Sequence, residues 1–547
     1  MSPSMAAVNA ELQQQHGGSP PHFLVVAYGI QSHINPCRLL AHRLACLGIV
    51  SGSGPVLATL AVPLSAHRRM FPNHPSGNTA DSDSDGVISY APYSDGLDDG
   101  SPMPRDAEGK ARVRRASFEG LSSVVASLAA LGRPVTCVVV SMVHPAALDV
   151  ARATALPLAV FWIQPATVLA AYYHFFHDDG GHYKELVTSH AADPDFEVSI
   201  PGLSLRRRPL RIRDFPTFLV DTTGSDIASS VNEALRELFE FMDQQGKNNA
   251  KVLVNTMEEL EPSAVAAMAE HLDLFPVGPV VASGSSNNNA SRNIHLFDHD
   301  NKAQYISWLD AQPASSVIYV SFGSIWTYSK PQMEEIAAGL KQCNRPFLLV
   351  VRKDGRQDQD VSSCLDELCA QELGIVVAWC DQAAVLAHPA VGCFVTHCGW
   401  NSTLEAAAHG VPVVAAPGMF DQPTNAFLAE QEWGAGVRVE KEKEDEGGVF
   451  AGAELARCVQ VVMGDGGRGM EIRGRAQALK EIARKAAADG GPAEKSLRNF
   501  VMAVVGQGSS SDNSNTSKLV EADVVEKLKG LEVSTGSSNG NVTSEVV

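Results

Sequence analysis

The feature that most constrains the fold of this chain is a unit that recurs along it: a short apolar run, a turn and a helical stretch. The first apolar run is His22–Tyr28, and a loop over Gly29–Asn35 follows it. Pro36 is predicted to open the next helix with Asn35 as its N-cap, because proline is favoured in the first helical turn. Continuous apolar runs of this length are typical of buried parallel strands. Their alternation with helices predicts an α/β fold, with helices on both faces of a parallel sheet.

The unit recurs in two series, and a polar segment separates them. This segment, Ala282–Asn293, is composed of small polar residues, as interdomain linkers are. Before it we predict further strands over Val135–Met142, Leu158–Ile163 and Lys251–Thr256, the last strand of that series. After it we predict strands over Ser316–Ser324, Pro346–Arg352, Gly374–Cys380, Gly392–His397 and Val411–Pro417. The expected architecture is therefore two α/β halves with a ligand cleft between them.

Charge and cysteine content restrict the class of partner. The chain has 43 Lys and Arg against 62 Asp and Glu residues, a formal net charge of −19. Nucleic acids and anionic membrane surfaces require basic patches, so we expect small molecules as partners instead. Ten cysteines without a C-x-x-C pair predict free thiols in a reducing compartment, not a disulfide framework or a zinc site.

No segment is predicted to cross a membrane or to direct secretion. The first 20 residues are polar and lack the apolar core of a signal peptide. The most hydrophobic segment, Ala155–Tyr173, is interrupted by Pro157, Gln164 and Pro165. We predict a buried strand, a turn and a helix there, since a membrane span needs an unbroken apolar helix. The expected location is cytoplasmic.

The turn after the predicted strand that ends at His397 has the densest set of polar side chains. Gly399 permits a tight turn, and a helix is predicted to begin near Ser402. Free backbone N–H groups at a helix start bind anions such as a diphosphate. A capping box of Ser402 and Glu405 explains the same residues without a ligand, and the residues alone leave both readings open. Ser324 ends another strand and is expected at the same edge of the sheet.

These residues belong to a longer segment that resembles a known family. Trp379–Gln422 is similar to the signature box of plant UDP-sugar-dependent glycosyltransferases of family 1, from its opening Trp-Cys-x-Gln to its closing Asp-Gln. The resemblance extends from about residue 20 to about residue 505. It implies the GT-B fold, in which two Rossmann-like parallel-sheet domains face each other across a cleft.

The resemblance also implies a division of the chain. We expect an N-terminal acceptor-binding domain over 21–280, a linker over 281–302 and a C-terminal UDP-sugar-binding domain over 303–490. A helix over 491–506 is expected to pack back toward the N-terminal domain. Residues 1–20 are expected to be a disordered extension and 507–547 a mostly disordered tail, in which 518–533 has the pattern of a short amphipathic helix.

The donor contacts implied by the resemblance involve three parts of a UDP-sugar. Uridine would be held by stacking on Trp379, by Cys380 and Gln382 beside it, and by Glu405 at the ribose hydroxyls. The diphosphate would be held by Ser324, His397, Gly399, Asn401 and Ser402, and the sugar by Trp400, Asp421 and Gln422. A closing Gln is the family's usual mark of UDP-glucose. No metal and no cofactor are expected, because no carboxylate cluster calls for magnesium.

The catalytic base implied by the resemblance is His33, which matches the family's histidine in Gly-His-Ile-Asn-Pro. A neutral imidazole can take a proton from an acceptor hydroxyl as the hydroxyl attacks the anomeric carbon. Many relatives orient this histidine with an Asp, but Ser141 stands at that position. His144 and Gln164 are expected in the acceptor pocket.

The sequence therefore predicts an inverting UDP-glucose-dependent glucosyltransferase that acts as a monomer on a small apolar plant acceptor. Ser141 and three other segments resemble the branch that includes anthocyanin 5-O-glucosyltransferases and enzymes making glucose esters of crocetin, indole-3-acetate and abscisate. Carboxylic acids are slightly favoured because they are already deprotonated at neutral pH, and phenols stay open. One alternative is a catalytically impaired UDP-sugar or small-molecule binding protein. Another is an NAD-type Rossmann oxidoreductase, which the absence of G-x-G-x-x-G after the first strand disfavours.

Overall fold

The computed structural model describes residues 20–48, 50, 54–72, 84–142, 144–177, 182–247, 249–281, 296, 302–324, 329–356, 359–369, 373–440 and 449–508. The expected extension over 1–20, linker over 281–302 and tail over 507–547 lie almost entirely outside these residues.

The first half of the chain forms a seven-stranded sheet in which all neighbouring strands are parallel, in the order β3-β2-β1-β4-β5-β8-β9. The strands are β1 (His22–Val26), β2 (Leu57–Pro63), β3 (Ser89–Tyr93), β4 (Cys137–Ser141), β5 (Leu158–Trp162), β8 (Lys251–Val254) and β9 (Asp273–Pro276). Because β1 pairs with both β2 and β4, the strand order reverses between β1 and β4. Ligands of open parallel sheets bind at the carboxyl ends of the strands at such a switch point.

The second half forms a six-stranded parallel sheet in the order β12-β11-β10-β13-β14-β15. Its strands are β10 (Val317–Ser321), β11 (Phe347–Val350), β12 (Gly374–Val377), β13 (Val391–Thr396), β14 (Val413–Ala415) and β15 (Gly436–Arg438). Here the order reverses between β10 and β13. Each half therefore has one switch point, and the predicted two-sheet α/β architecture is confirmed.

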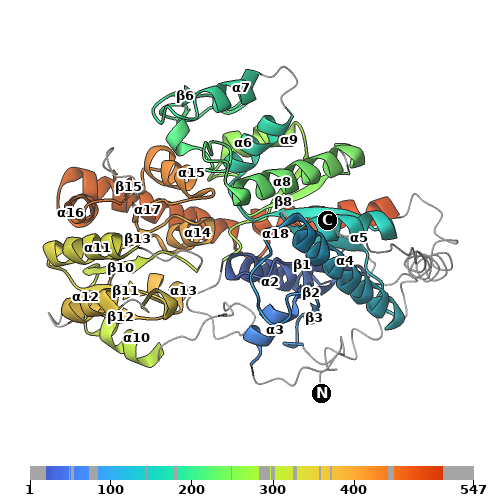
Figure 1. Ribbon diagram of the computed structural model, residues 1–547, viewed down its shortest axis with the longest axis horizontal. Coiled ribbons are helices and arrows are strands. Elements are labelled where there is room, and N and C mark those ends of the chain that lie inside the picture. Colours follow the sequence, from blue (N-terminus) through green and yellow to red (C-terminus); the bar gives the residue numbers. More distant parts are fainter. Residues whose placement is uncertain are drawn as a thin grey trace, which may run out of the picture.

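Helices cover the faces of both sheets, and Figure 1 shows the two halves side by side. The helices of the first half are α2 (Gln31–Cys46), α3 (Leu64–Met70), α4 (Ala107–Ala130), α5 (Pro145–Thr154), α6 (Ala166–Phe176), α7 (His182–Ser189), α8 (Asp226–Gln245) and α9 (Pro262–Ala269). Those of the second half are α10 (Lys302–Asp310), α11 (Lys330–Cys343), α12 (Gln359–Cys369), α13 (Gln382–Leu386), α14 (Trp400–His409), α15 (Gln422–Phe427), α16 (Gly452–Met463), α17 (Gly467–Ala486) and α18 (Pro492–Gly508). A small antiparallel ribbon of β6 (Glu197–Val198) and β7 (Leu210–Arg211) precedes the short helix η1 (Ile212–Asp214).

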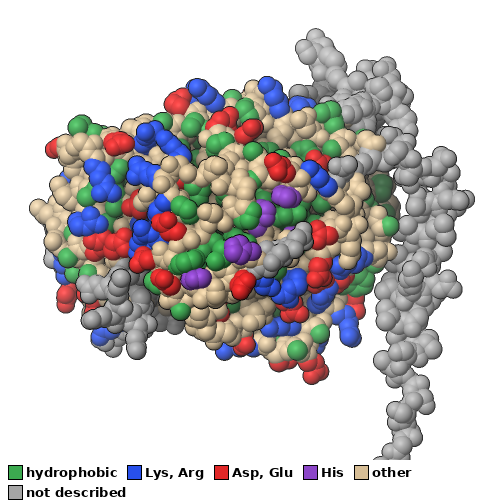
Figure 2. Space-filling model, turned by 90° about the horizontal axis from the view of Figure 1, so that it is seen from above, with side chains coloured by type: hydrophobic (Ala, Val, Ile, Leu, Met, Phe, Trp, Pro, Cys, Tyr) green, Lys and Arg blue, Asp and Glu red, His purple; other side chains and the backbone are tan. Residues whose placement is uncertain are grey.

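The segment Ala155–Tyr173 forms the buried strand β5, a turn at Pro165 and the start of α6, as predicted. Within the described residues, no helix combines the length and the apolar content needed to cross a bilayer. On the face seen in Figure 2, acidic and basic side chains are interspersed over the surface.

Two predictions about the first half are wrong. Lys251–Thr256 is not the last strand, because β9 pairs with β8 at the edge of the sheet. The β9 sequence, Asp-Leu-Phe-Pro, is too short and too mixed in polarity to be recognised as an apolar run. The helix after β1 begins at Gln31, so Pro36 lies inside it and Asn35 is not its N-cap. Ile30 takes the N-cap position in an extended conformation, without a side-chain hydrogen bond.

Several contacts join the two halves. The last described helix, α18, returns to the first sheet, where the ring of Phe500 lies 5.5 Å from that of Phe23 and 5.6 Å from that of Phe275. Asp214 of η1 is buried and contacts Arg438 of β15 at 2.8 Å. These contacts hold the carboxyl edges of the two sheets toward each other, which is where the site lies.

Candidate active site

A cleft of about 1050 Å³ lies between the two halves and is lined by residues that follow strands of both sheets. It brings together nearly every residue that the sequence predicted for the site: His33, His144, Gln164, Ser324, Trp379, Cys380, Gln382, His397, Gly399, Trp400, Asn401, Ser402, Glu405, Asp421 and Gln422. Ser141 is the exception; it is fully buried and lies behind His33. The strand ends at both switch points therefore face one cavity.

His33 lies in the first turn of α2 and not in a loop, directly after β1. Its Nδ1 lies 3.0 Å from Oγ of Ser141, which is the last residue of the neighbouring strand β4. The Ser141 hydroxyl oxygen also accepts a hydrogen bond from the Tyr28 N–H at 3.3 Å. Burial, with a smaller contribution from His144, lowers the pKa of His33 to about 4. His33 is therefore a neutral imidazole at physiological pH.

His144 and Gln164 follow β4 and β5 and line the same half of the cleft. Nε2 of His144 lies 2.8 Å from the hydroxyl of Tyr93, and burial lowers the His144 pKa to about 4. The side-chain oxygen of Gln164 is buried and has no hydrogen-bond partner within the described residues. Buried polar atoms are usually paired, so this carbonyl is available to a ligand donor group.

On the opposite wall, His397 is packed between two glycines. A Cβ atom at Gly323 or at Gly399 would lie 2.6 Å from Nε2 of His397, closer than real side chains approach. Gly323 also has a φ of +81°, which favours glycine. Burial lowers the pKa of His397 to about 4. The glycines thus allow this neutral imidazole to reach the cleft between the turns that follow β10 and β13.

Helix α14 begins at Trp400, with Gly399 as an N-cap that makes no side-chain hydrogen bond. Ser402 and Glu405 are therefore residues of the helix and not its capping box. Instead, both accept hydrogen bonds from Nε2 of Gln382, at 2.9 Å and 2.7 Å. Trp400, Asn401 and Ser402 of the first turn of α14 line the cleft, and no side chain caps this helix start, which suits it to an anionic ligand.

The Gln382 amide is oriented by a residue that the sequence analysis missed. The Tyr319 hydroxyl donates to Oε1 of Gln382 at 3.1 Å and also lies 3.4 Å from the thiol of Cys380. Tyr319 lines the cleft from β10, and its ring stacks on Phe394 at 4.7 Å. A signal was present in the sequence, because Tyr319 lies within Ser316–Ser324, a strand that was predicted to reach the site.

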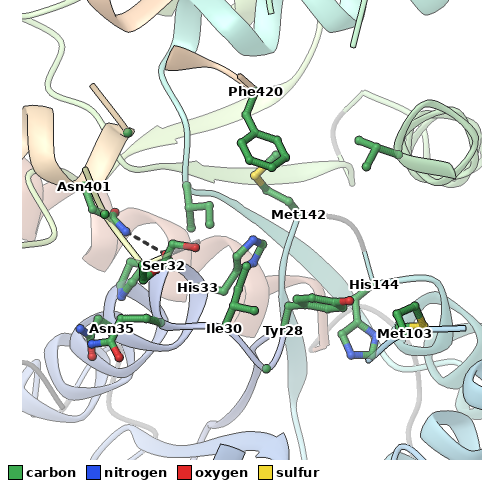
Figure 3. Close-up of a pocket in the computed structure, with 18 of the residues that line it drawn as sticks. Tyr28, Ile30, Ser32, His33, Asn35, Met103, Met142, His144, Asn401 and Phe420 are labelled. Carbon is green, nitrogen blue, oxygen red and sulfur yellow. Dashed lines mark hydrogen bonds between the residues drawn. The ribbon is translucent and has the colours of Figure 1, made fainter. Parts of the chain in front are cut away.

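Asn401 and Trp400 connect the start of α14, after β13, with the first half. Nδ2 of Asn401 donates to the Ser32 carbonyl at 2.8 Å, as the dashed line in Figure 3 shows. In an unbroken helix that carbonyl would accept from the N–H of residue 36, which a proline lacks. Nε1 of Trp400 donates to the Asn255 carbonyl at 2.7 Å. The side-chain donors of both residues are therefore engaged between the two halves.

After the loop that follows β14, Asp421 is the N-cap residue of α15 and Gln422 is the first residue of that helix. Oε1 of Gln422 accepts from the N–H groups of Gly418 and Met419, at 2.8 Å and 3.1 Å, which leaves its NH₂ group for a ligand. Asp421 is buried, and burial raises its pKa to about 6, although a hydrogen bond from Asn425 at 2.8 Å acts in the opposite direction.

A parallel-sheet domain on each side of one cleft, each presenting its switch point, defines the GT-B class of glycosyltransferase architecture. Comparisons with known proteins agree. A sequence model described as UDP-glucoronosyl and UDP-glucosyl transferase matches residues 288–455. Phloretin 4'-O-glucosyltransferase of Malus domestica is 38% identical over 88% of this chain and 97% of its own length. The chloroplastic crocetin glucosyltransferase of Gardenia jasminoides is 38% identical over 88% of this chain and 96% of its own.

The crystal structure of Os79 from O. sativa in complex with UDP superposes with a TM-score of 0.71, at 29% identity, over 88% of this chain and all of that chain. The chain belongs to the plant family 1 UDP-glycosyltransferases. The predicted family, fold and enzyme class are thereby confirmed, and the oxidoreductase alternative is excluded.

Proposed function

We propose that this enzyme transfers glucose from UDP-glucose, with inversion at the anomeric carbon, to an oxygen of a small apolar acceptor. The observation that carries the proposal is the convergence of two switch points on one cleft. His33 comes from the first half, and Ser324 and His397 come from the second. A donor held by the second half would present its anomeric carbon to an acceptor held by the first.

The donor roles follow from the chemistry of the second wall. Trp379 offers an aromatic plane to uracil. Glu405, oriented by Gln382, offers a carboxylate to the vicinal ribose hydroxyls. Ser324, His397 and the first-turn N–H groups of α14 surround the position proposed for the diphosphate, where the helix dipole favours negative charge. Asn401 contributes its backbone N–H there, since its side chain is engaged with Ser32.

His33 is proposed as the general base. In this role Nδ1–H would donate to the Ser141 hydroxyl oxygen, because only the tautomer with a free Nε2 lone pair can take the acceptor proton. As the acceptor oxygen bonds to the anomeric carbon, its proton passes to Nε2, the bond from that carbon to the diphosphate oxygen breaks, and UDP leaves with the electron pair. General-base catalysis of this kind contributes about 10²- to 10⁴-fold.

Ser141 bears on the acceptor class. Its hydroxyl orients His33 but adds no negative charge to stabilise an imidazolium, as a carboxylate would. A carboxylic acid acceptor needs no proton removed at neutral pH, so it makes the smaller demand on this base. The relatives named for phloretin and for crocetin represent the phenolic and the carboxylic possibility, respectively. We keep both acceptor classes in the proposal.

The second candidate is a binding protein with impaired catalysis, which is favoured because the side chain paired with His33 Nδ1 is the Ser141 hydroxyl and not a carboxylate. One experiment separates the two. The protein is incubated with UDP-glucose and, in turn, a flavonol, phloretin and crocetin; UDP release and glucoside mass are then measured together. Equal amounts of UDP and glucoside support the enzyme. Binding of UDP and acceptor without release of UDP supports the binding protein.

Three further expectations stay predictions. The enzyme is expected to act without a metal; within the described chain no group of three metal-binding side chains occurs, and magnesium titration of the activity tests this directly. The monomeric state is also untested. A cytoplasmic location is still expected from the sequence, and the crocetin relative is named as chloroplastic.

A further inference from the structure

Two residues with strained backbone conformations line the cleft. Met142 has a φ of 48° and Phe420 a φ of 63°, the left-handed region that non-glycine residues rarely occupy. Met142 directly follows Ser141, and Phe420 directly precedes Asp421. Both side chains line the cavity. Such conformations persist only where the surrounding structure holds them, and they cluster at functional sites.

The strain at Phe420 is imposed across the two halves of the molecule. The Phe420 N–H donates to the Thr217 hydroxyl oxygen at 2.9 Å, and the Thr217 N–H donates to the Phe420 carbonyl at 2.9 Å. The neighbouring Phe218 meets the Phe420 ring edge-on, with the ring centres 5.2 Å apart. A loop of the first half therefore fixes the residue next to the proposed sugar-binding pair Asp421 and Gln422.

Figure 3 shows where these two side chains lie. In this view the Phe420 ring points into the cavity from the second half, with the Met142 side chain below it and the His33 ring lower still. Ile30 and Met103 add further apolar surface to the cavity lining. Aromatic faces and thioether sulfur are polarisable groups that favour contact with π-systems.

We propose that Met142 and Phe420 are specificity-determining residues that hold a flat, conjugated ring of the acceptor beside His33. The proposal rests on the proposed glucosyl transfer and narrows its acceptor class to planar conjugated molecules, phenolic or carboxylic, over saturated ones. The left-handed backbones direct both side chains into the pocket, and Thr217 keeps Phe420 there.

The test compares a flavonol with a saturated terpenoid alcohol as acceptors. Phe420→Gly and Met142→Gly remove the side chains at positions where glycine suits the backbone. We expect kcat/KM for the flavonol to fall about tenfold or more, with a much smaller change for the terpenoid alcohol. The KM for UDP-glucose should change less than about twofold. Phe420→Leu, which keeps bulk but not the flat ring, should show an intermediate loss.

Ala155→Gly is the matched control, because Ala155 also has a positive φ of 52° but lies outside the cavity lining, at the end of α5. It should leave both acceptors unaffected, and melting temperatures of all variants report whether they fold. Equal losses for both acceptors, or a loss confined to UDP-glucose affinity, would overturn the proposal.

Binding of the flavonol in the presence of UDP, measured by calorimetry, separates this proposal from the proposed function. If the wild type binds the flavonol but transfers no glucose, the proposed function fails alone. Undiminished flavonol binding by both glycine variants contradicts the specificity role, whatever the transfer activity.

Discussion

At the scale of single residues, burial sets the protonation states in the cleft. His33, His144 and His397 each have a pKa lowered to about 4, whereas burial raises that of Asp421 to about 6. Three neutral imidazoles and one carboxylate close to its titration range therefore surround the proposed reaction centre. The pH dependence of this enzyme should accordingly report Asp421 before it reports His33.

We expect kcat/KM for UDP-glucose to fall as the pH is lowered through about 6, because protonation removes the charged acceptor proposed for the sugar hydroxyls. Asp421→Asn should abolish this limb, and initial rates from about pH 5 to 8 measure it. Burial makes the pKa of Asp421 higher in the folded protein than in the unfolded chain. Ionisation of Asp421 therefore lowers the stability of the native state as the pH rises through about 6. The same variant should therefore melt at a higher temperature at pH 7 while being less active. An acid limb that persists in the variant would assign it to another group.

Tyr319 provides a test of donor positioning. Tyr319→Phe keeps the ring that stacks on Phe394 but removes the hydrogen bond to Gln382, which orients Glu405. We expect a KM for UDP-glucose about 3- to 10-fold higher, with kcat unchanged, because one hydrogen bond contributes about 0.5–1.5 kcal/mol. The 2'-deoxyribose analogue of the donor should lose less affinity than UDP-glucose. Equal losses for the two donors would show that Tyr319 does not act through the ribose contact.

At the scale of elements, the turns after β10 and β13 decide whether His397 can reach the cleft. Gly399→Ala introduces a Cβ 2.6 Å from Nε2 of His397 at a normal φ, and Gly323→Ala introduces the same clash at a φ of +81°. Both variants should weaken UDP binding in calorimetry. Gly323→Ala should also lose about 1–2 kcal/mol more of the free energy of unfolding, the cost of a left-handed non-glycine residue. Wild-type UDP affinity in both would contradict the role given to His397.

The same elements show what the sequence can predict. Alternating apolar runs predicted the strands that carry the site, and the candidate donor-binding residues between Trp379 and Gln422 do line one cleft. The start of α2 was misplaced because the usual preference for proline in a first helical turn does not apply: Asn401 from the other half serves the Ser32 carbonyl that Pro36 leaves free. Met142 and Phe420 were missed for a related reason. Local sequence does not encode the backbone conformation of Phe420, which Thr217 holds from the other half, or that of Met142, whose N–H donates to the Phe161 carbonyl of the neighbouring strand.

At the scale of the whole molecule, a buried ion cluster connects the two halves. The Asp214 side chain is only 2% exposed and contacts Arg208 and Arg438, each at 2.8 Å. Asp214→Asn keeps the shape but leaves two cations near each other without their partner. We expect a loss of about 3–5 kcal/mol in the free energy of unfolding, measured by denaturant titration. Glu481→Gln, which breaks an exposed pair with Arg484, should cost less than about 1 kcal/mol. If Asp214→Asn lowered the free energy of unfolding as little as Glu481→Gln does, the buried cluster would not stabilise the molecule.

In the proposed reaction, His33 takes the acceptor proton while the second half of the molecule holds UDP-glucose. The most direct test measures glucoside formation and the configuration of its anomeric carbon by NMR, for the wild type and for His33→Ala, with UDP binding measured in parallel. We predict a β-glucoside from the wild type, at least about 100-fold slower transfer by His33→Ala, and the same affinity of both for UDP. An α-glucoside from the wild type, or full transfer by His33→Ala to a phenolic acceptor, would contradict the account.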